Sequence, residues 1–568
     1  MQVIQQTTWL IVVILSTPAL AQTSPATPPL PRIPPGVIPL GPPSDQPLPD
    51  PLPPLPADDL LPPAPPLPER PPAIPDVIRV REFRVIGSTV FSPEELAAVT
   101  APFTHRDLTF AELLQARSAV TQLYVERGYI TSGALIPPQT IDAGIVTIQV
   151  IEGSLEAIDI TGTRRLNPSY VRQRLARATT VPLNRERLLQ ALQLLQLDPL
   201  IQRVVADLQA GTRLGTNVLQ VTIEEADPFS LEIGIDNGRS PSVGSFRRQV
   251  QATHLNILGL GDRLSLGYLN TDGSHEINGS YTLPLNARNG TLRLSVGHAD
   301  SQVIEPPFDR AGISAPSHYY ELTLRQPLHQ TPTNELALSL TASRQESQTI
   351  VDGFGPVPLS TDADEQGRTR VSALRFGQEW TQRSSQHVLA VRSQISLGVD
   401  WFDANVSDLA ADSRFWSWRT QGQWVRRFAP ETLLLIRADW QLASDALVAV
   451  EQFSIGGPQS VRGYRQDALL TDNGVLLSAE LRLPVLRVTS IDGVLQVVPF
   501  LDVGTGWNHD MPPLTGETLV GVGVGLVWQQ DDRLSARLDW GIPLVPIADN
   551  PQTWQENGIY FSVIYTLF

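Results

Sequence analysis

Two short motifs near the C-terminal end of the chain carry side chains that would form an ion pair if folding brings them together. The first is Val461-Arg462-Gly463-Tyr464, and the second is Phe500-Leu-Asp502-Val-Gly504. An arginine presents a planar fork of N–H donors that matches a carboxylate, so Arg462 and Asp502 are complementary in charge and in shape. These residue types predict a reversible, non-covalent contact rather than bond-making chemistry.

The strand that holds the second motif decides whether this pair can form. A β-strand points its residues alternately to its two faces. If Leu501 and Val503 face outward, the inward face holds the other three residues of the motif, Phe500, Asp502 and Gly504. An inward carboxylate needs a cation, which an arginine at a loop tip supplies. The alternative is that Arg462 is an ordinary exposed loop arginine and that Asp502 is a solvated charge.

The composition argues against most other kinds of site. The 568 residues contain no cysteine, and the eight histidines form no cluster with ligand spacing, so neither a thiolate site nor a metal site is expected. There is no phosphate-binding loop, no G-x-S-x-G or H-E-x-x-H motif and no acid/base pair of carboxylates, so we expect no catalytic residue, no cofactor and no enzyme activity. The formal charge is −16, and the 42 basic residues, all arginine, form no run, which disfavours nucleic acid as a partner.

The region that holds both motifs, residues 227–568, has the pattern of a membrane β-barrel. No uncharged apolar run approaches the roughly 20 residues of a spanning helix, and sixteen short alternating segments are separated by Gly, Asn, Asp and Pro. In Leu519–Trp528 one face is apolar and the other consists of Gly521, Gly523 and Gly525, as expected for a lipid-facing strand around a crowded interior. Ten of the eleven tryptophans lie in this region, as interfacial girdles require. We therefore predict sixteen antiparallel strands.

Before the barrel, residues 77–153 and 154–226 each predict a small β-α-α-β-β domain. The segment Val85–Pro93 recurs as Ile160–Pro168, with an offset of 75 residues. In both, a strand ends at a glycine, and a capping residue followed by proline begins a helix. Two capping boxes begin the helices of the first unit. Each domain should place its helices on one face of a three-stranded sheet.

The N-terminal 76 residues have a different character. Residues 1–21 predict a secretory signal peptide, because a short apolar run is followed by Ala19-Leu20-Ala21, the small-x-small cleavage pattern. Residues 22–76 contain 23 prolines in 55 positions, which removes backbone donors and predicts a disordered, extended tether. The alternatives are an ordinary buried helix for the first stretch and a ligand for a proline-reading groove for the second.

The two motifs resemble those of the two-partner secretion transporters, the TpsB or hemolysin secretion/activation protein family within the BamA-like barrel superfamily. In that superfamily a V-R-G-Y loop folds back into the barrel lumen, and its arginine pairs with the aspartate of an F-x-D-x-G strand. The resemblance implies a gating-loop motif, in which Gly463 allows the tight tip and Tyr464 stacks within it, formed by Val461, Arg462, Gly463 and Tyr464. It implies a partner motif on the barrel wall, formed by Phe500, Asp502 and Gly504.

The two N-terminal units resemble the polypeptide-transport-associated (POTRA) domains of this branch. Glu126-Arg-Gly-Tyr-Ile130, the Pro137-Pro-Gln139 turn and Val150-Ile-Glu-Gly153 are similar to the first domain, and Leu197-Asp-Pro-Leu200 is similar to the second. Two such domains favour the secretion branch over the assembly factors. The proline-rich segment departs from the family, because well-known members begin with a plug helix that this composition cannot form.

The resemblance implies an outer-membrane transporter that secretes a large, unfolded, TpsA-like partner exoprotein through its own barrel. The POTRA domains, in the periplasm of a Gram-negative-type bacterium, would capture the cargo, and the V-R-G-Y loop would gate the lumen. The expected partners are this exoprotein, outer-membrane lipid and, during biogenesis, the barrel assembly machinery. Two alternatives remain open: a factor that inserts other barrel proteins into the outer membrane, and a passive porin with a periplasmic anchor.

Overall fold

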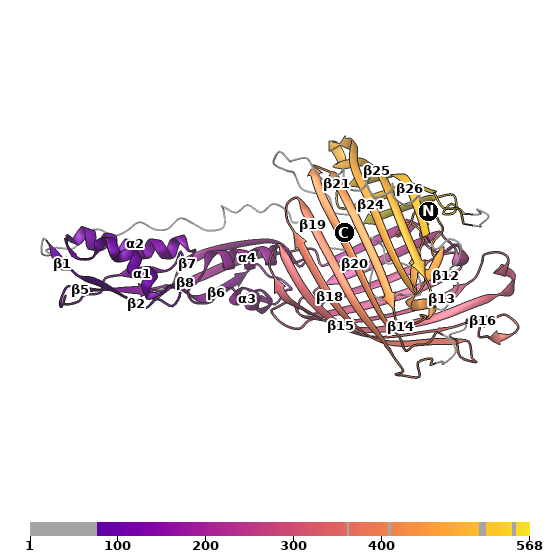
Figure 1. Ribbon diagram of the computed structural model, residues 1–568, viewed down its shortest axis with the longest axis horizontal. Helices are drawn as coiled ribbons and strands as arrows, with labels where there is room; N and C mark the ends of the chain where they lie inside the picture. Colours follow the sequence, from indigo (N-terminus) through magenta and orange to yellow (C-terminus); the bar gives the residue numbers. More distant parts are fainter. Residues whose placement is uncertain (1–76, 361–362, 407–410, 510–517, 548–552, 568) are drawn as a thin grey trace, which may run out of the picture.

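The computed structural model describes residues 77–360, 363–406, 411–509, 518–547 and 553–567. The predicted signal peptide (1–21), the predicted tether (22–76) and the terminal Phe568 lie outside these residues. Two small modules form an arm that extends from one end of a large barrel (Figure 1). Within the described ranges, no helix is long and apolar enough to cross a membrane.

The first module packs two helices on a three-stranded sheet of order β2-β5-β4. Its elements are β1 (Ile78–Val80), β2 (Glu82–Ile86), α1 (Pro93–Thr100), η1 (Ala101–Phe103), β3 (Arg106–Leu108), α2 (Phe110–Glu126), β4 (Gly133–Leu135) and β5 (Ile145–Ile151). Both predicted capping boxes are present, at Ser92 and Thr109. The sequence pattern predicts a strand over Ile130–Leu135, but β4 begins only at Gly133, because a turn closed by the bond from the Ser132 N–H to the Tyr129 carbonyl precedes it.

The second module repeats this plan, with sheet order β6-β8-β7. Its elements are β6 (Ser154–Thr161), α3 (Pro168–Ala176), α4 (Arg185–Gln196), β7 (Ile201–Ala210) and β8 (Thr216–Glu225). In both modules the glycine that follows the edge strand before the first helix, β2 or β6, lies against a carbonyl oxygen of the central strand. A Cβ would lie 2.7 Å from the Val150 oxygen at Gly87 and 2.3 Å from the Ile223 oxygen at Gly162. The repeated glycine therefore serves the same close approach twice.

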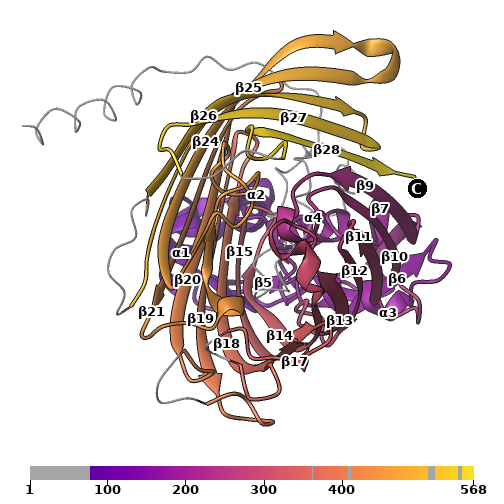
Figure 2. The ribbon, with the colours of Figure 1, turned by 90° about the vertical axis from the view of Figure 1, so that its right-hand side faces the viewer.

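The predicted sixteen-stranded antiparallel barrel is confirmed, and β28 closes it by pairing with β9. Figure 2 shows the strands following one another around the barrel. The strands are β9 (Phe229–Asp236), β10 (Arg247–Leu255), β11 (Arg263–Asn270), β12 (Ser274–Pro284), β13 (Thr291–Gln302), β14 (Ile313–Gln330), β15 (Asn334–Gln348), β18 (Arg368–Arg383), β19 (His387–Val399), β20 (Trp416–Ala429), β21 (Thr432–Ala443), β24 (Asn473–Val488), β25 (Gly493–Trp507), β26 (Thr518–Gln530), β27 (Leu534–Pro543) and β28 (Ile559–Thr566). Two very short strands, β16 (Ile350–Val351) and β17 (Gly355–Pro356), form a hairpin in the connection from β15 to β18.

Side chains along the barrel strands alternate as the sequence predicts. On β25, Phe500 and Asp502 are buried, whereas Leu501 between them is 47% exposed. On β26, Gly521 is buried and Val524 is 41% exposed. The outward face of these strands is therefore apolar, and the inward face combines glycines and the polar Asp502 with buried apolar side chains such as Phe500 and Leu519.

The arm is joined to the barrel through the second module. The Asn167 N–H donates to the Gly259 carbonyl, in the turn between β10 and β11, at 2.9 Å. The guanidinium of Arg174 stacks 3.3 Å from the centroid of the Tyr170 ring and donates to the side-chain oxygen of Asn289, in the turn between β12 and β13, at 2.8 Å. The modules therefore lie at the barrel end where β9 begins and where these turns are short.

Candidate functional site

The connection from β21 to β24, residues 444–472, is called the lumen loop here because its tip lies among inward-facing barrel side chains. It contains β22 (Phe453–Ile455) and β23 (Leu469–Thr471), which pair with each other. The first sequence motif forms its tip. Val461 and Arg462 are 0% exposed and Tyr464 is 4% exposed, so the tip is fully enclosed.

Arg462 and Asp502 form the contact that the two motifs predict. The Arg462 Nε lies 2.7 Å from Oδ2 of Asp502, and its Nη2 lies 2.8 Å from Oδ1. The backbone N–H of Arg462 donates to the same carboxylate at 3.1 Å. Phe500, two residues earlier on β25, places its ring centroid 3.5 Å from the guanidinium carbon. Asp502 therefore holds both the side chain and the backbone of the tip, and the aromatic ring covers one face of the cation.

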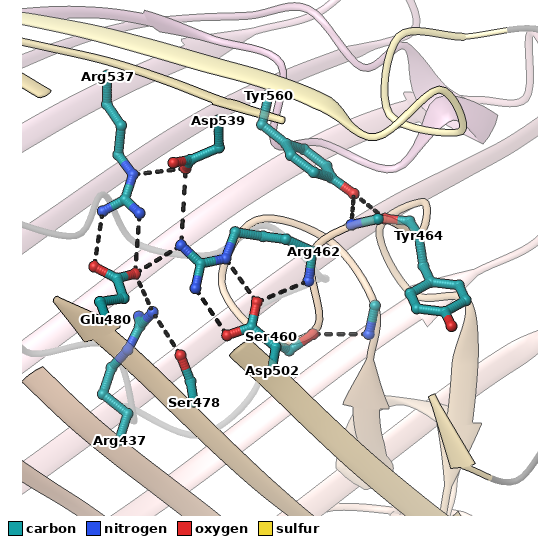
Figure 3. A network of polar contacts seen from close by, with 12 residues as sticks. Arg437, Ser460, Arg462, Tyr464, Ser478, Glu480, Asp502, Arg537, Asp539 and Tyr560 are labelled. Atoms are coloured by element: carbon teal, nitrogen blue, oxygen red, sulfur yellow. Dashed lines mark hydrogen bonds and ion pairs between the residues drawn. The ribbon is translucent and has the colours of Figure 1, made fainter. Parts of the chain in front are cut away.

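A second carboxylate, Glu480 on β24, completes the environment of the tip arginine (Figure 3). Its Oε1 accepts from Arg462 Nη1 at 2.7 Å, from Arg437 at 3.1 Å and from Arg537 at 2.9 Å. Arg537 also donates to Asp539 at 2.6 Å. Glu480 is 1% exposed. One buried carboxylate thus joins the loop to three barrel strands.

The cluster has unequal numbers of charges. Its arginines are Arg437, Arg462, Arg482 and Arg537, and its carboxylates are Glu480, Asp502 and Asp539. Four positive charges face three negative charges, so one positive charge is in excess; Arg462 and the three carboxylates are buried, whereas Arg437 and Arg537 are 17% and 18% exposed. Removing any of the carboxylates increases this excess, which is costly in a buried site.

Glycines on the barrel wall make the space that the tip occupies. Gly463 has a φ of +106°, a conformation that side chains disfavour, so the tip turns sharply there. A Cβ on Gly521 of β26 would lie 1.9 Å from the carbonyl oxygen of Arg462, and one on Gly541 of β27 would lie 2.6 Å from the Gly463 nitrogen. A Cβ on Gly504 of β25 would lie 2.9 Å from the Val461 side chain. Of the three glycines that the sequence predicts on the inward face of β26, Gly521 is therefore the one against which the loop backbone lies.

The hydroxyls of two tyrosines, Tyr464 and Tyr560, form further hydrogen bonds between the tip and the barrel. The Tyr464 ring packs in an apolar cluster of the loop and wall, and its hydroxyl lies 3.0 Å from the Val520 carbonyl and 3.1 Å from the Val545 nitrogen. The hydroxyl of Tyr560, on the closing strand β28, accepts from the Gly463 N–H at 2.9 Å and donates to the Tyr464 carbonyl at 2.6 Å. The tip therefore also holds the last strand of the barrel.

The seven residues of the two predicted motifs meet at this one site. Sequence reasoning missed four of their partners: Glu480, Arg537, Asp539 and Tyr560. A signal for the charged ones exists, because Glu480 and Asp539 are charges at inward positions of alternating strands that flank β25 and β26. Tyr560 has no such signal, because its role depends on the loop reaching across to β28. Within the part of the chain that the structure describes, no group of three or more His, Asp or Glu residues is arranged to hold a metal ion.

Comparisons with known proteins agree with this architecture. The family model for the haemolysin secretion/activation protein ShlB/FhaC/HecB matches residues 215–528, and the model for the POTRA domain, ShlB-type, matches residues 78–153. The outer membrane transporter CdiB of Dickeya dadantii is 23% identical over 463 residues, 79% of each chain. The hemolysin transporter protein HpmB of Proteus mirabilis is 24% identical over 416 residues, 70% of this chain and 71% of that one.

Solved structures show the same fold. CdiB from Escherichia coli superposes with a TM-score of 0.68 at 21% identity, covering 91% of this chain and 93% of that one. BamA from Haemophilus ducreyi, lacking POTRA domains 1–3, has a TM-score of 0.52 at 16% identity, covering 86% of this chain and 100% of that one. The family consists of transporters and secretion factors rather than enzymes, and its barrels lie in the outer membrane with their POTRA domains in the periplasm. The chain belongs to the haemolysin secretion/activation protein family ShlB/FhaC/HecB.

Proposed function

We propose that this protein secretes one large partner exoprotein, unfolded, through the lumen of its own barrel. The observation that carries the proposal is the lumen loop, whose tip is fully buried yet attached to the wall by non-covalent contacts alone. Because these contacts can break and form again, the loop can block the lumen in one state and leave it open in another. Relatives named as hemolysin transporters and as heme/hemopexin transporters support export of a single dedicated cargo.

The two modules supply edges on which an extended cargo segment can bind. Among the described residues, β2 pairs with β5 alone and β7 pairs with β8 alone, so each strand has one edge without a sheet partner. An extended peptide can add to such an edge through main-chain hydrogen bonds, whatever its side chains. Capture in the periplasm therefore needs no folded cargo, and folding of the cargo outside the cell drives its export.

The experiment that tests gating is the change Arg462→Ala. Without its guanidinium the tip loses its side-chain bonds to Asp502 and Glu480, so the lumen loop no longer has one defined closed position and the pore should open more often. Because controlled release of the loop is then lost, secretion of the partner should fall at least tenfold while the barrel remains inserted. Arg248→Ala is the matched control, because Arg248 pairs with Asp272 through side chains that are 47% and 60% exposed. Wild-type secretion by the Arg462→Ala protein contradicts gating by this loop.

Deletion of the whole protein separates secretion from membrane insertion of other barrels. The proposal requires loss of one secreted product, with the outer-membrane protein profile unchanged. A broad loss of outer-membrane proteins would instead indicate an assembly factor.

A further inference from the structure

A second buried ion pair holds the other part of the lumen loop. Glu451 is the last residue of the short helix η4 (Ala449–Glu451). The guanidinium of Arg375 donates two hydrogen bonds to its carboxylate, from Nη2 to Oε1 at 2.6 Å and from Nη1 to Oε2 at 3.0 Å. The two side chains are 3% and 5% exposed. Arg375 Nη1 also donates to the hydroxyl of Ser396 at 3.0 Å. A two-pronged contact of this kind, closed to water, is lost at high cost when either partner is removed.

This pair lies on a different part of the barrel wall from the tip. Arg375 belongs to β18, and the strand order runs β18-β19-β20-β21-β24, so four steps separate it from the strand of Glu480. The carboxylates that pair with the tip arginine lie on β24, β25 and β27. Buried ion pairs therefore hold the lumen loop at two separate places on the wall. A more exposed pair adds to them, because Arg465, just after the tip, contacts Glu305 and Glu556 in the β13–β14 and β27–β28 connections.

Each ion pair has its own apolar packing. Leu447 and Val448, just before η4, pack with Val371 and Ala373, which share the inward face of β18 with Arg375. The tip has a separate apolar cluster. We define residues 447–451 as the base of the loop and residues 461–464 as its tip. Base and tip are two independently packed parts of one loop.

Hydrogen bonds fix the base to its surroundings in addition. Asp472, at the end of the loop, accepts from the Leu447 N–H at 2.9 Å and from the His509 N–H at 2.9 Å. The side-chain amide of Gln441 on β21 donates to the Glu451 carbonyl at 2.9 Å. The base is thus joined both to the wall and to the returning limb of the loop.

We propose that Glu451 and Arg375 form a base anchor that stays closed when the tip is released, so that the lumen loop swings inside the barrel and does not leave it. The base pair is backed by apolar packing, and a second carboxylate, Glu321 of β14, lies near Arg375, whereas the tip cluster carries an excess positive charge. The tip is therefore the part of the loop that detaches from the wall when cargo enters the lumen. The role in gating rests on the proposed function, but the anchor itself can be tested without cargo.

The first test measures conductance in planar bilayers. Glu451→Gln and Arg375→Met each leave one member of the base pair buried without its partner, so the fraction of time that the pore is open should rise at least tenfold. Arg325→Met is the matched control, because Arg325 of β14 pairs with Glu335 and Glu379 on the wall. If both base variants stay as closed as the wild type, the base anchor is refuted.

The second test uses disulfide tethers, for which the absence of cysteine from the sequence is an advantage. Asp412→Cys with Leu447→Cys tethers the base, where the two backbones form an isolated bridge. Val461→Cys with Gly504→Cys tethers the tip, where a Cβ at 504 would lie 2.9 Å from the Val461 side chain. The base tether should leave partner secretion within twofold of its reduced form, whereas the tip tether should lower secretion at least tenfold until a reductant is added.

The outcomes separate the anchor from the function. A base tether that blocks secretion as strongly as the tip tether, with recovery on reduction, shows that the whole loop must leave and overturns the proposal. If the wild-type protein secretes no partner, the proposed function fails, and the conductance measurements still decide whether the base anchor exists.

Discussion

Replacing Glu480 with glutamine tests the charge cluster at the tip. The change keeps the size of the side chain but removes the negative charge that faces the guanidinium groups of Arg437, Arg462 and Arg537 at 2.7 to 3.1 Å. The excess of positive charge in the cluster then rises from one to two. We expect the closed state of the lumen loop to be destabilised and the pore to open more often.

The size of the effect follows from which contact the loop loses on opening. Arg437 and Arg537 belong to the barrel wall, so they stay beside position 480 in both the open and the closed state. The free energy lost when Glu480 no longer pairs with them is therefore nearly the same in both states and does not change the open-to-closed ratio. The Arg462 contact exists in the closed state alone. A hydrogen bond to a charged group is worth about 1.5–3 kcal/mol, and about 1.4 kcal/mol corresponds to a factor of ten. The open-to-closed ratio should therefore rise about 10-fold to 100-fold.

Single-channel conductance measures this ratio directly. Glu379→Gln is the matched control, because that carboxylate pairs with Arg325 on the wall and its side chain is 22% exposed. Because the Glu480 contact is buried, the effect should persist at high ionic strength, where exposed ion pairs are screened. An inserted Glu480→Gln barrel that stays as closed as the wild type refutes the assignment of Glu480 to loop closure.

Three further perturbations probe other contacts. Gly521→Ala places a Cβ 1.9 Å from a loop carbonyl and should increase the open fraction, whereas Gly422→Ala, with open space around its Cβ, should not; conductance compares them. Tyr560→Phe removes the hydroxyl that bonds two backbone groups of the tip and should increase the open fraction about tenfold, at about 1–1.5 kcal/mol. Hydrogen bonds from Thr212 and Thr216 lower the pKa of Glu156 in the second module to about 2. The stability that its ionised form contributes should be complete above pH 4.5, the ordinary carboxyl value, and be lost as the pH falls through about 2; hydrogen exchange at the Thr212 amide measures this, and Glu156→Gln should abolish the pH dependence.

Many elements of the fold could be predicted from the sequence, because residues at single positions determine the direction of a strand's side chains or the start of a helix. Alternation on β25 and β26 fixes which side chains face inward, and capping residues with proline mark the helix starts. The ends of strands were harder to predict. The sequence pattern predicts a strand over Tyr319–Gln326, but β14 (Ile313–Gln330) is longer. The residues before Tyr319 pair with β13 and β16, and those after Gln326 pair with β15.

The site was predictable in part. Arg462 and Asp502 stand in motifs, so their contact could be expected from the sequence. The convergence of Glu480, Arg537 and Asp539 depends on the register of β24, β25 and β27, which a single sequence does not fix. The pair of Glu451 and Arg375 joins a loop to a strand 76 residues away in the chain, and neither residue stands in a pattern that marks it.

Crosslinking of a stalled partner protein tests most directly whether cargo passes through this lumen. Two adjacent residues of β15 face opposite sides of the wall: Ser339 is 7% exposed and faces inward, and Leu340 is 53% exposed and faces the lipid. A photoreactive side chain at position 339 should form an adduct with the partner during secretion, and the same group at position 340 should form none. Adducts from position 340, or none from position 339 while secretion proceeds, would contradict export through this barrel.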